Sequence, residues 1–128
     1  WSWSRGLGDV YKRQPICCAA ASAVINTLSA DQLWDRADII RAAIFEGLDS
    51  EIADGDLIRD RRGIGLMIGI EPTVPTENLV RMALDRHLLI NGAGGNTIRL
   101  LPPLVMSTDD ARRVGATVAD IVNSLKDA

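Results

Sequence analysis

Two segments of the sequence each hold a pair of short runs that alternate in polarity around glycines, and this feature constrains the fold most. In the first segment the runs are Leu57 to Arg61 and Leu66 to Glu71, with Gly63 and Gly65 between them. Short alternating runs are typical of strands, and glycine between two such runs permits a tight connection. The spacing therefore predicts an antiparallel pair of strands.

The second segment predicts another pair of strands. They are expected at Leu88 to Asn91 and at Thr97 to Leu101, joined by the turn GAGG. Read as NGAGGN, this stretch resembles a glycine-rich phosphate loop, but such loops lead from a strand into a helix. Here a strand is predicted on both sides. A hairpin turn that needs positive φ is therefore the better interpretation.

Outside these hairpins, apolar residues recur at helical spacing in four segments. Pro15 suits the first position of one helix, and Ser29 to Gln32 predicts a capping box that opens the next, with Gly47 as its weak point. Thr76 is predicted to cap a third helix and Thr108 to start a fourth. The predicted buried faces of these last two helices are Leu79, Val80, Ala83 and Leu84, and Ala111, Val114, Val118, Ile121, Val122 and Leu125.

The elements follow one another as helix, helix, hairpin, helix, hairpin, helix. Because each helix has a single apolar stripe, this order predicts the α+β class: a small antiparallel sheet with helices packed on one face, preceded by a long helix. The chain has 128 residues, of which 47% are hydrophobic, enough for one domain with its own core. We assign this domain to residues 15–128.

Residues 1–14, WSWSRGLGDVYKRQ, differ from the rest of the chain. They hold two of the three tryptophans and the only tyrosine, and they show neither helical nor strand periodicity. The stretch LGDVYKRQ resembles translated read-through of a sequencing-library adapter. We therefore interpret residues 1–14 as a non-native or disordered arm and leave them out of the predicted fold.

Composition and isolated reactive residues argue against several kinds of function. The formal net charge of -3 gives no reason to expect nucleic acid as a partner, and no apolar run is long enough to cross a membrane, so we expect a cytoplasmic protein. Cys17 and Cys18 are adjacent, so they cannot chelate a metal by themselves, and we expect reduced thiols with one of them buried. His87 is the only histidine, which argues against a metal site or a catalytic triad.

Arg99 is the candidate binding residue. It lies within the apolar run NTIRLLPPL, where its permanent charge requires an anionic partner if the side chain is buried. On the predicted strand it shares a face with Thr97, near a strand end that two prolines fix. The partner is either the carboxylate of a ligand or an internal carboxylate such as Glu71 or Asp60. Residue types alone favour neither reading.

Three stretches of the sequence occur together in a familiar order: PICCAAASAVI (15–25), RRGIGLMIGIE (61–71) and LLINGAGGNTIRLLPPL (88–104). They resemble the C-terminal segment of class-III, pyridoxal-phosphate-dependent aminotransferases, and IRLLPPL is more particular to the acetylornithine and ornithine branch. The resemblance implies that residues 15–128 form the small C-terminal domain of such an enzyme. It also implies that Arg99 binds the substrate carboxylate while an amino group passes to 2-oxoglutarate.

The same resemblance implies that much of the enzyme lies elsewhere. The family's cofactor is held by a lysine, whereas the lysines here, Lys12 and Lys126, lie outside any matching motif. The cofactor-binding acid and threonine of the family belong upstream of Pro15. We therefore expect a gene fragment that is inactive alone and has no catalytic, cofactor-binding or metal residue of its own.

The complete enzyme implied by this resemblance is a homodimer of arginine biosynthesis or related amino-acid metabolism. Two other readings stay open. One is a stand-alone, non-enzymatic α+β domain that binds an acidic metabolite through Arg99. The other is a purely structural module.

Overall fold

The computed structural model describes residues 14–74 and 78–126. The chain divides into two compact units, which are residues 1–34 and residues 35–128, and each unit is described by itself. The predicted arm falls almost entirely outside the described residues. Its absence from the fold therefore stays a prediction.

Helix α2 (Pro15–Ala30) begins at the predicted proline, with Gln14 as its N-cap. Cys17 and Cys18 are both free and exposed, so the expectation that one of them is buried is wrong. The large apolar side chains that α2 exposes are Ile16, Val24 and Ile25. Within the described residues no single helix is long and apolar enough to span a membrane, although Pro15–Ala30 and Leu33–Glu51 pass that test when taken together as a bent pair.

The boundary between the first two helices differs from the predicted one. Ser29 lies inside α2, and the chain turns at Gln32, which has a φ of 47°. A short 3-10 helix (Leu33–Asp35) then leads directly into α3 (Arg36–Glu51). The predicted capping box is wrong because its residues end the first helix instead of opening the second.

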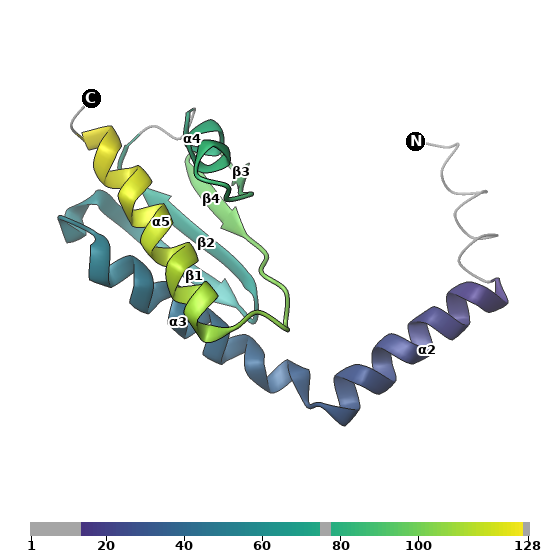
Figure 1. The fold of residues 1–128 in the computed structure, drawn as a ribbon. Coiled ribbons are helices and arrows are strands. Elements are labelled where there is room, and N and C mark those ends of the chain that lie inside the picture. The colour runs from purple at the N-terminus through teal and green to yellow at the C-terminus, as the bar shows by residue number, and fades with distance from the viewer. Residues whose placement is uncertain (1–13, 75–77, 127–128) are drawn as a thin grey trace, which may run out of the picture. The chain divides into compact units, whose positions relative to one another are not determined.

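Four strands form one antiparallel sheet in the order β1-β2-β4-β3 (Figure 1). Strand β1 (Ile58–Ile64) pairs with β2 (Met67–Pro72), and β4 (Thr97–Leu100) lies between β2 and β3 (Asn91–Ala93). Both predicted hairpins are therefore present. The loop between the second pair contains Gly94 and Gly95 at φ values of 59° and 90°, which confirms a turn that requires positive φ.

The third strand starts later than the predicted one. The backbone amide of Leu88 donates to the carbonyl of Ala83 at 2.8 Å and so closes the end of α4 (Leu79–Asp85). The amide of Leu88 is therefore used by the helix end, and strand β3 begins only at Asn91. Thr76, the predicted cap of this helix, lies outside the described residues.

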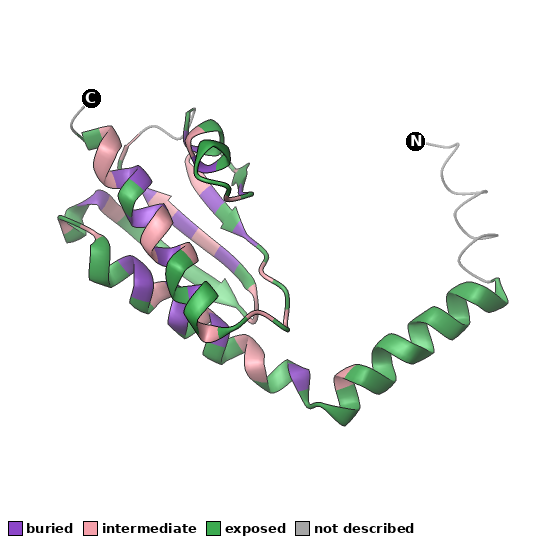
Figure 2. Cartoon of the chain, viewed as in Figure 1, coloured by how far each residue is buried: buried purple, intermediate pink, exposed green. Residues whose placement is uncertain are grey.

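Helices α3, α4 and α5 (Thr108–Lys126) cover one face of the sheet, as predicted (Figure 1). Val80 and Leu84 differ from the prediction: they are 44% and 57% exposed, because α4 turns Leu79, Ala83 and the partly buried Met82 toward the core. The core between sheet and helices (Figure 2) contains Ile40, Ile44, Leu48, Ile68, Ile70, Leu79, Ala83, Ile98, Leu100, Ala111, Val118, Ile121 and Val122.

Gly47 is a point of close helix packing and not the weak point predicted from its propensity. A Cβ built on Gly47 would lie 2.0 Å from the carbonyl oxygen of Arg112 on α5. Real side-chain carbons do not approach a backbone oxygen so closely. Glycine is therefore required here so that α3 and α5 can pack backbone against backbone.

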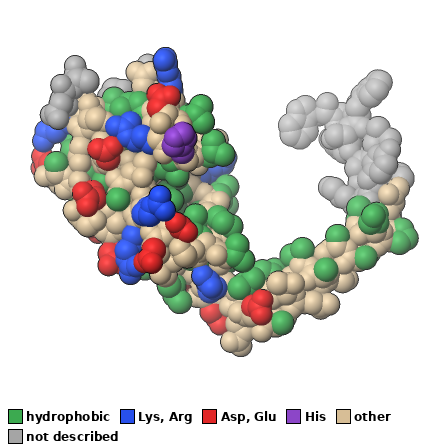
Figure 3. Space-filling view, in the orientation of Figure 1, with side chains coloured by type: hydrophobic (Ala, Val, Ile, Leu, Met, Phe, Trp, Pro, Cys, Tyr) green, Lys and Arg blue, Asp and Glu red, His purple; other side chains and the backbone are tan. Residues whose placement is uncertain are grey.

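The surface of residues 35–126 carries charges of both signs close together, as Figure 3 shows on one face. Several of these side chains are paired between elements, including Arg86 with Asp120 at 2.8 Å and Arg112 with Glu46 at 3.0 Å. Exposed pairs of this kind contribute little stability each. Because Arg86 and Arg112 are already paired with carboxylates, they are poor candidates for binding an anionic ligand.

Candidate functional site

Strand β4 places Arg99 on the face of the sheet that the helices leave uncovered. Its neighbours Ile98 and Leu100 point into the core and are 2% and 4% exposed, whereas Arg99 is exposed. The alternation of a strand produces this arrangement, and the predicted faces are confirmed. The apolar run around Arg99 does not bury the arginine itself, so its charge keeps contact with water.

Arg99 lines a hollow of about 340 Å³ on this uncovered face. Two apolar side chains from the first hairpin, Ile64 and Met67, are 90% and 64% exposed and form part of its wall. Arg62 and Arg99 contribute the cations. A small molecule with a carboxylate and an aliphatic portion matches this combination of groups. The complete lining is Arg62, Gly63, Ile64, Met67, Ile68, Gly69, Ala93, Thr97 and Arg99.

Within the described part of the chain, the Arg99 side chain makes no ion pair and no hydrogen bond. The two carboxylates considered as internal partners are held by other arginines. Glu71 pairs with Arg59 and Arg62 at 3.3 Å each, and Asp60 pairs with Arg62. The internal salt bridge left open by the sequence is therefore not formed. The guanidinium of Arg99 is available to another carboxylate.

The chain that follows Arg99 is anchored to α3. The amide of Met106 donates to the carbonyl of Pro103 at 3.0 Å, and Arg36 of α3 donates through Nη2 to the carbonyl of Met106 at 2.9 Å. These contacts hold the segment after β4 in place and so limit movement of the strand end next to Arg99. Sequence reasoning missed Arg36, because its acceptor lies 70 positions away and no local pattern connects the two.

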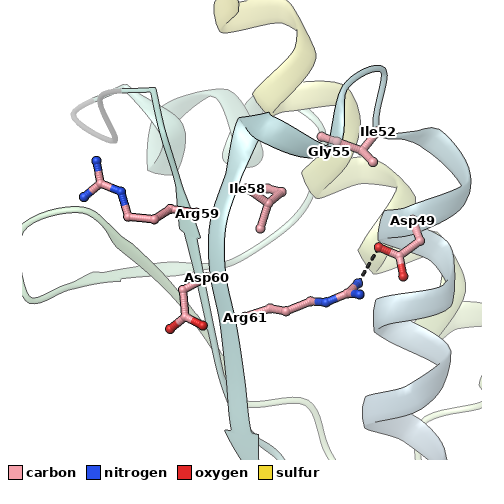
Figure 4. Close-up of a pocket in the computed structure, with 7 residues that line it drawn as sticks. All are labelled: Asp49, Ile52, Gly55, Ile58, Arg59, Asp60 and Arg61. Carbon is pink, nitrogen blue, oxygen red and sulfur yellow. Dashed lines mark hydrogen bonds and ion pairs between the residues drawn. The ribbon is translucent and has the colours of Figure 1, made fainter.

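A second hollow, of about 320 Å³, lies between the end of α3 and β1 (Figure 4). The Arg61 side chain crosses it and pairs with Asp49, while Arg59 and Asp60 point away from α3. The hydrogen bond from Arg61 to Asp49 raises the pKa of Arg61, and the guanidinium also lies over the Phe45 ring, 5.7 Å from its centre. Both arginines that line this hollow, Arg59 and Arg61, are paired with carboxylates, so it lacks an unpaired guanidinium such as that of Arg99 and is the poorer ligand site.

The other residues singled out by the sequence do not form a site. His87 follows Arg86, the C-cap of α4, with a φ of 60°, and its backbone amide donates to the carbonyl of Leu84 at 2.9 Å. No group of three or more histidine, cysteine, aspartate or glutamate side chains that could hold a metal occurs among residues 14–74 and 78–126. Arg99 therefore remains the best candidate binding residue.

Comparison with known proteins identifies the family of this chain. The family model for aminotransferase class-III matches residues 2–122. The chain belongs to the class-III aminotransferase family. This agrees with the resemblance seen in the sequence motifs. The match begins inside the predicted arm, and it extends through most of α5.

Individual relatives of this class-III aminotransferase chain carry a more specific name. The chain is 36% identical over 107 residues to acetylornithine aminotransferase 1 of Bordetella pertussis, and this alignment covers 84% of the chain and 27% of the relative. It is 36% identical over 120 residues to acetylornithine aminotransferase of Agrobacterium fabrum, covering 92% of this chain and 30% of the relative. The chain thus spans less than a third of the length of these relatives.

Solved structures support the same fold for this class-III aminotransferase chain. Acetylornithine aminotransferase from Elizabethkingia anophelis matches with a TM-score of 0.74 and 26% identity, over 86% of this chain and 29% of that one. Ornithine aminotransferase from Toxoplasma gondii matches with a TM-score of 0.76 over 88% of this chain and 28% of that one. Because the two sequences are only 24% identical, this match is evidence for the fold alone. That Toxoplasma structure is described as having partial occupancy of PLP at the protein active site.

Proposed function

We propose that this chain is the C-terminal part of an acetylornithine or ornithine type aminotransferase and that it supplies the group that binds the substrate carboxylate. The complete enzyme would transfer an amino group to 2-oxoglutarate with pyridoxal phosphate, as a cytoplasmic homodimer in arginine biosynthesis or related metabolism. The observation that carries the proposal is the unpaired Arg99 beside an apolar wall, in a chain of this family.

The proposed role of Arg99 is to bind and orient the substrate. A guanidinium donates two parallel hydrogen bonds to a carboxylate, which fixes both the position and the plane of that group. The exposed apolar side chains Ile64 and Met67 would contact the aliphatic part of the same molecule. Holding a substrate in one orientation raises the fraction of encounters that lead to reaction. This role requires no movement of the strand that carries Arg99.

Pyridoxal phosphate does not fit the residues described here. The cofactor supplies the chemistry that makes amino transfer possible, and it needs a lysine amine at its carbonyl carbon. Lys126, the only lysine among the described residues, pairs through Nζ with Asp54 at 3.0 Å at the end of α5. It does not line the hollow around Arg99. We therefore propose that the cofactor site belongs to a part of the enzyme other than these residues.

A second candidate function rests on the same unpaired arginine. A non-enzymatic domain could bind an acidic metabolite through Arg99 and release it unchanged. Such a domain would need no cofactor and no lysine. The two candidates differ in their genetic context, because only the enzyme requires an upstream reading frame that encodes a lysine for the cofactor.

Two measurements test the proposal. Recovery of the gene with its upstream sequence, followed by an assay of amino transfer from N-acetylornithine to 2-oxoglutarate, should show activity that depends on pyridoxal phosphate. The present chain alone should show none, and borohydride treatment with the cofactor should leave no label on Lys126. A reading frame without a cofactor lysine would favour the binding domain, and a labelled Lys126 would overturn the assignment of the cofactor to another part of the enzyme.

A further inference from the structure

A row of paired residues crosses the uncovered face of the sheet. Arg62 of β1 is opposite Gly69 of β2, and Gly69 is opposite Arg99 of β4. Residues opposite each other on neighbouring strands project from the same face. Because Gly69 has no side chain, the two arginines lie on either side of a bare position. A Cβ on Gly69 would lie 3.5 Å from Cγ of Arg62, so the Arg62 side chain extends over this glycine.

The guanidinium of Arg62 is engaged on this face through both of its terminal nitrogens. Its Nη1 pairs with Asp60 and with Oε2 of Glu71, the latter at 3.3 Å, and its Nη2 donates to Oγ1 of Thr97 at 3.2 Å. Thr97 precedes Arg99 by two positions on β4, and therefore projects from the same face. Arg62 thus reaches across Gly69 toward the strand that carries Arg99. Arg62 therefore pairs with both carboxylates, Asp60 and Glu71, that were considered as internal partners for Arg99.

Glu71 is the carboxylate that competes most directly for Arg99. It follows Gly69 by two positions on β2, so it is the diagonal neighbour of Arg99 in the register of the two strands. Diagonal neighbours are about 7 to 8 Å apart at their backbones, which long side chains can span. The Glu71 side chain is only 23% exposed, and its other oxygen, Oε1, pairs with Arg59. Removing Arg62 would leave Oε2 of Glu71 without its partner and within reach of Arg99.

We infer that Arg62 is a positioning residue that holds Glu71 away from Arg99 and so keeps the Arg99 guanidinium open to the carboxylate of a ligand. The inference rests on the proposed function, and it adds a residue that acts through Arg99. Its physical basis is competition between two cations for one carboxylate. The side chain of Arg62 lines the same hollow, so the test must separate competition from direct attraction between Arg62 and the ligand.

The first experiment uses the complete chain without ligand. The Nε–H resonance of Arg99 is recorded by NMR in the wild type, Arg62→Gln, Glu71→Gln and the double variant. We expect Glu71→Gln to leave this resonance unchanged in the wild-type background but to shift it in the Arg62→Gln background. Such a shift reports a new pair between Arg99 and Glu71. If Glu71→Gln shifts the Arg99 resonance in neither background, the inference is overturned, whatever ligand Arg99 binds.

The second experiment titrates the same variants with glutarate and follows the same Arg99 resonance. An exposed ion pair is worth up to about 1 kcal/mol, so capture of Arg99 by Glu71 should weaken glutarate binding about threefold to sixfold in Arg62→Gln. Adding Glu71→Gln should restore the wild-type affinity, and Arg62→Lys, which keeps a cation for Glu71, should retain it. Arg113→Gln removes the same charge from an exposed position on α5 and serves as the control.

The two experiments separate the failure of this inference from the failure of the proposed function. If Arg62 attracts the ligand directly, Arg62→Gln will weaken binding equally with and without Glu71, and the inference is overturned. If glutarate does not shift Arg99 even in the wild type, the proposed substrate contact fails. The ligand-free experiment then still decides whether Arg62 keeps Glu71 from Arg99. Arg62 is 54% exposed, and Arg62→Met, which also removes the cation, provides a second variant should Arg62→Gln not fold.

Discussion

A Cβ built on Gly115 of α5 would lie 2.0 Å from the carbonyl oxygen of Ile44 on α3. The two helices therefore pack with no side chain between them at this point, and Gly47 of α3 makes the matching approach to Arg112. Both glycines are buried. Since α3 and α5 form most of the helical layer behind the sheet, this contact sets how closely these two helices can pack together.

We predict that Gly115→Ala strongly destabilises the chain. The added methyl group meets backbone atoms that cannot rotate away, so the helices must separate. Overpacking of this kind typically costs about 1 to 3 kcal/mol in the free energy of unfolding, and a backbone clash belongs at the upper end. Urea unfolding followed by circular dichroism measures the loss. Gly55→Ala is the matched control, because a Cβ there meets nothing within 4 Å, and equal losses for both variants would contradict the packing argument.

We predict that Asp54 makes the stability of the chain depend on pH in the acid range. The hydrogen bond from the backbone amide of Asp56, followed by the hydrogen bond and charge of Lys126, lowers the pKa of Asp54 below its ordinary value of 3.8. A carboxyl group with a lowered folded-state pKa stabilises the fold fully above the unfolded-state value. That contribution disappears as the pH falls through the lower, folded-state pKa.

The measurement for Asp54 is the urea midpoint of the wild type and of Asp54→Asn at a series of pH values. The difference between the two proteins should be constant near neutral pH and should shrink on acidification below pH 3.8. Lys126→Met should reduce this pH dependence without abolishing it, because the amide of Asp56 still donates to the carboxylate at 3.1 Å. A difference that stays constant throughout the acid range would show that the pKa of Asp54 is not lowered by folding.

We predict that Arg99→Lys in the full-length enzyme impairs substrates that carry the carboxylate. Lysine keeps the charge but loses the planar pair of donors, so kcat/KM should fall roughly 30-fold to 150-fold. This corresponds to a loss of about 2 to 3 kcal/mol of transition-state stabilisation. A simple amine without a carboxylate should react as with the wild type. The melting temperature should change little, because the wild-type side chain has no partner within the described residues. Equal losses for both substrate types together with a lower melting temperature would remove Arg99 from the substrate site.

We predict that deletion of residues 1–14, of which only Gln14 at the N-cap of α2 lies among the described residues, leaves the stability of the sheet and its helices unchanged. These residues show no pattern that could add a helix or strand to the sheet and its helices. Changes that touch no packed feature usually alter the free energy of unfolding by less than about 0.5 kcal/mol. Urea midpoints of the full and shortened chains test this. A larger loss would mean that Trp1 or Trp3 packs on the folded part and that the arm is native.

The elements predicted best are those whose signals are local. Helix α5 begins at Thr108 as predicted, because acidic residues in its first turn and a regular apolar stripe lie within the segment itself, and Ser107, just before it, accepts from the amide of Asp110. The two hairpins and the uncovered position of Arg99 follow from the alternation of polar and apolar residues together with glycine turns. The start of α3 and the bounds of β3 were predicted less well, since neighbouring helix ends and turns compete for the same backbone groups.

The sequence by itself determined the α+β order, the apolar stripe of α5 and the face on which Arg99 lies, because helical and strand periodicities are properties of consecutive residues. Only the tertiary structure decided that Gly47 and Gly115 form a close helix contact and that Glu71 pairs with Arg62 and not with Arg99. Those relationships join residues on different elements. They depend on the register between strands and on the separation of helices, which are set when distant apolar surfaces pack together and which no local pattern encodes.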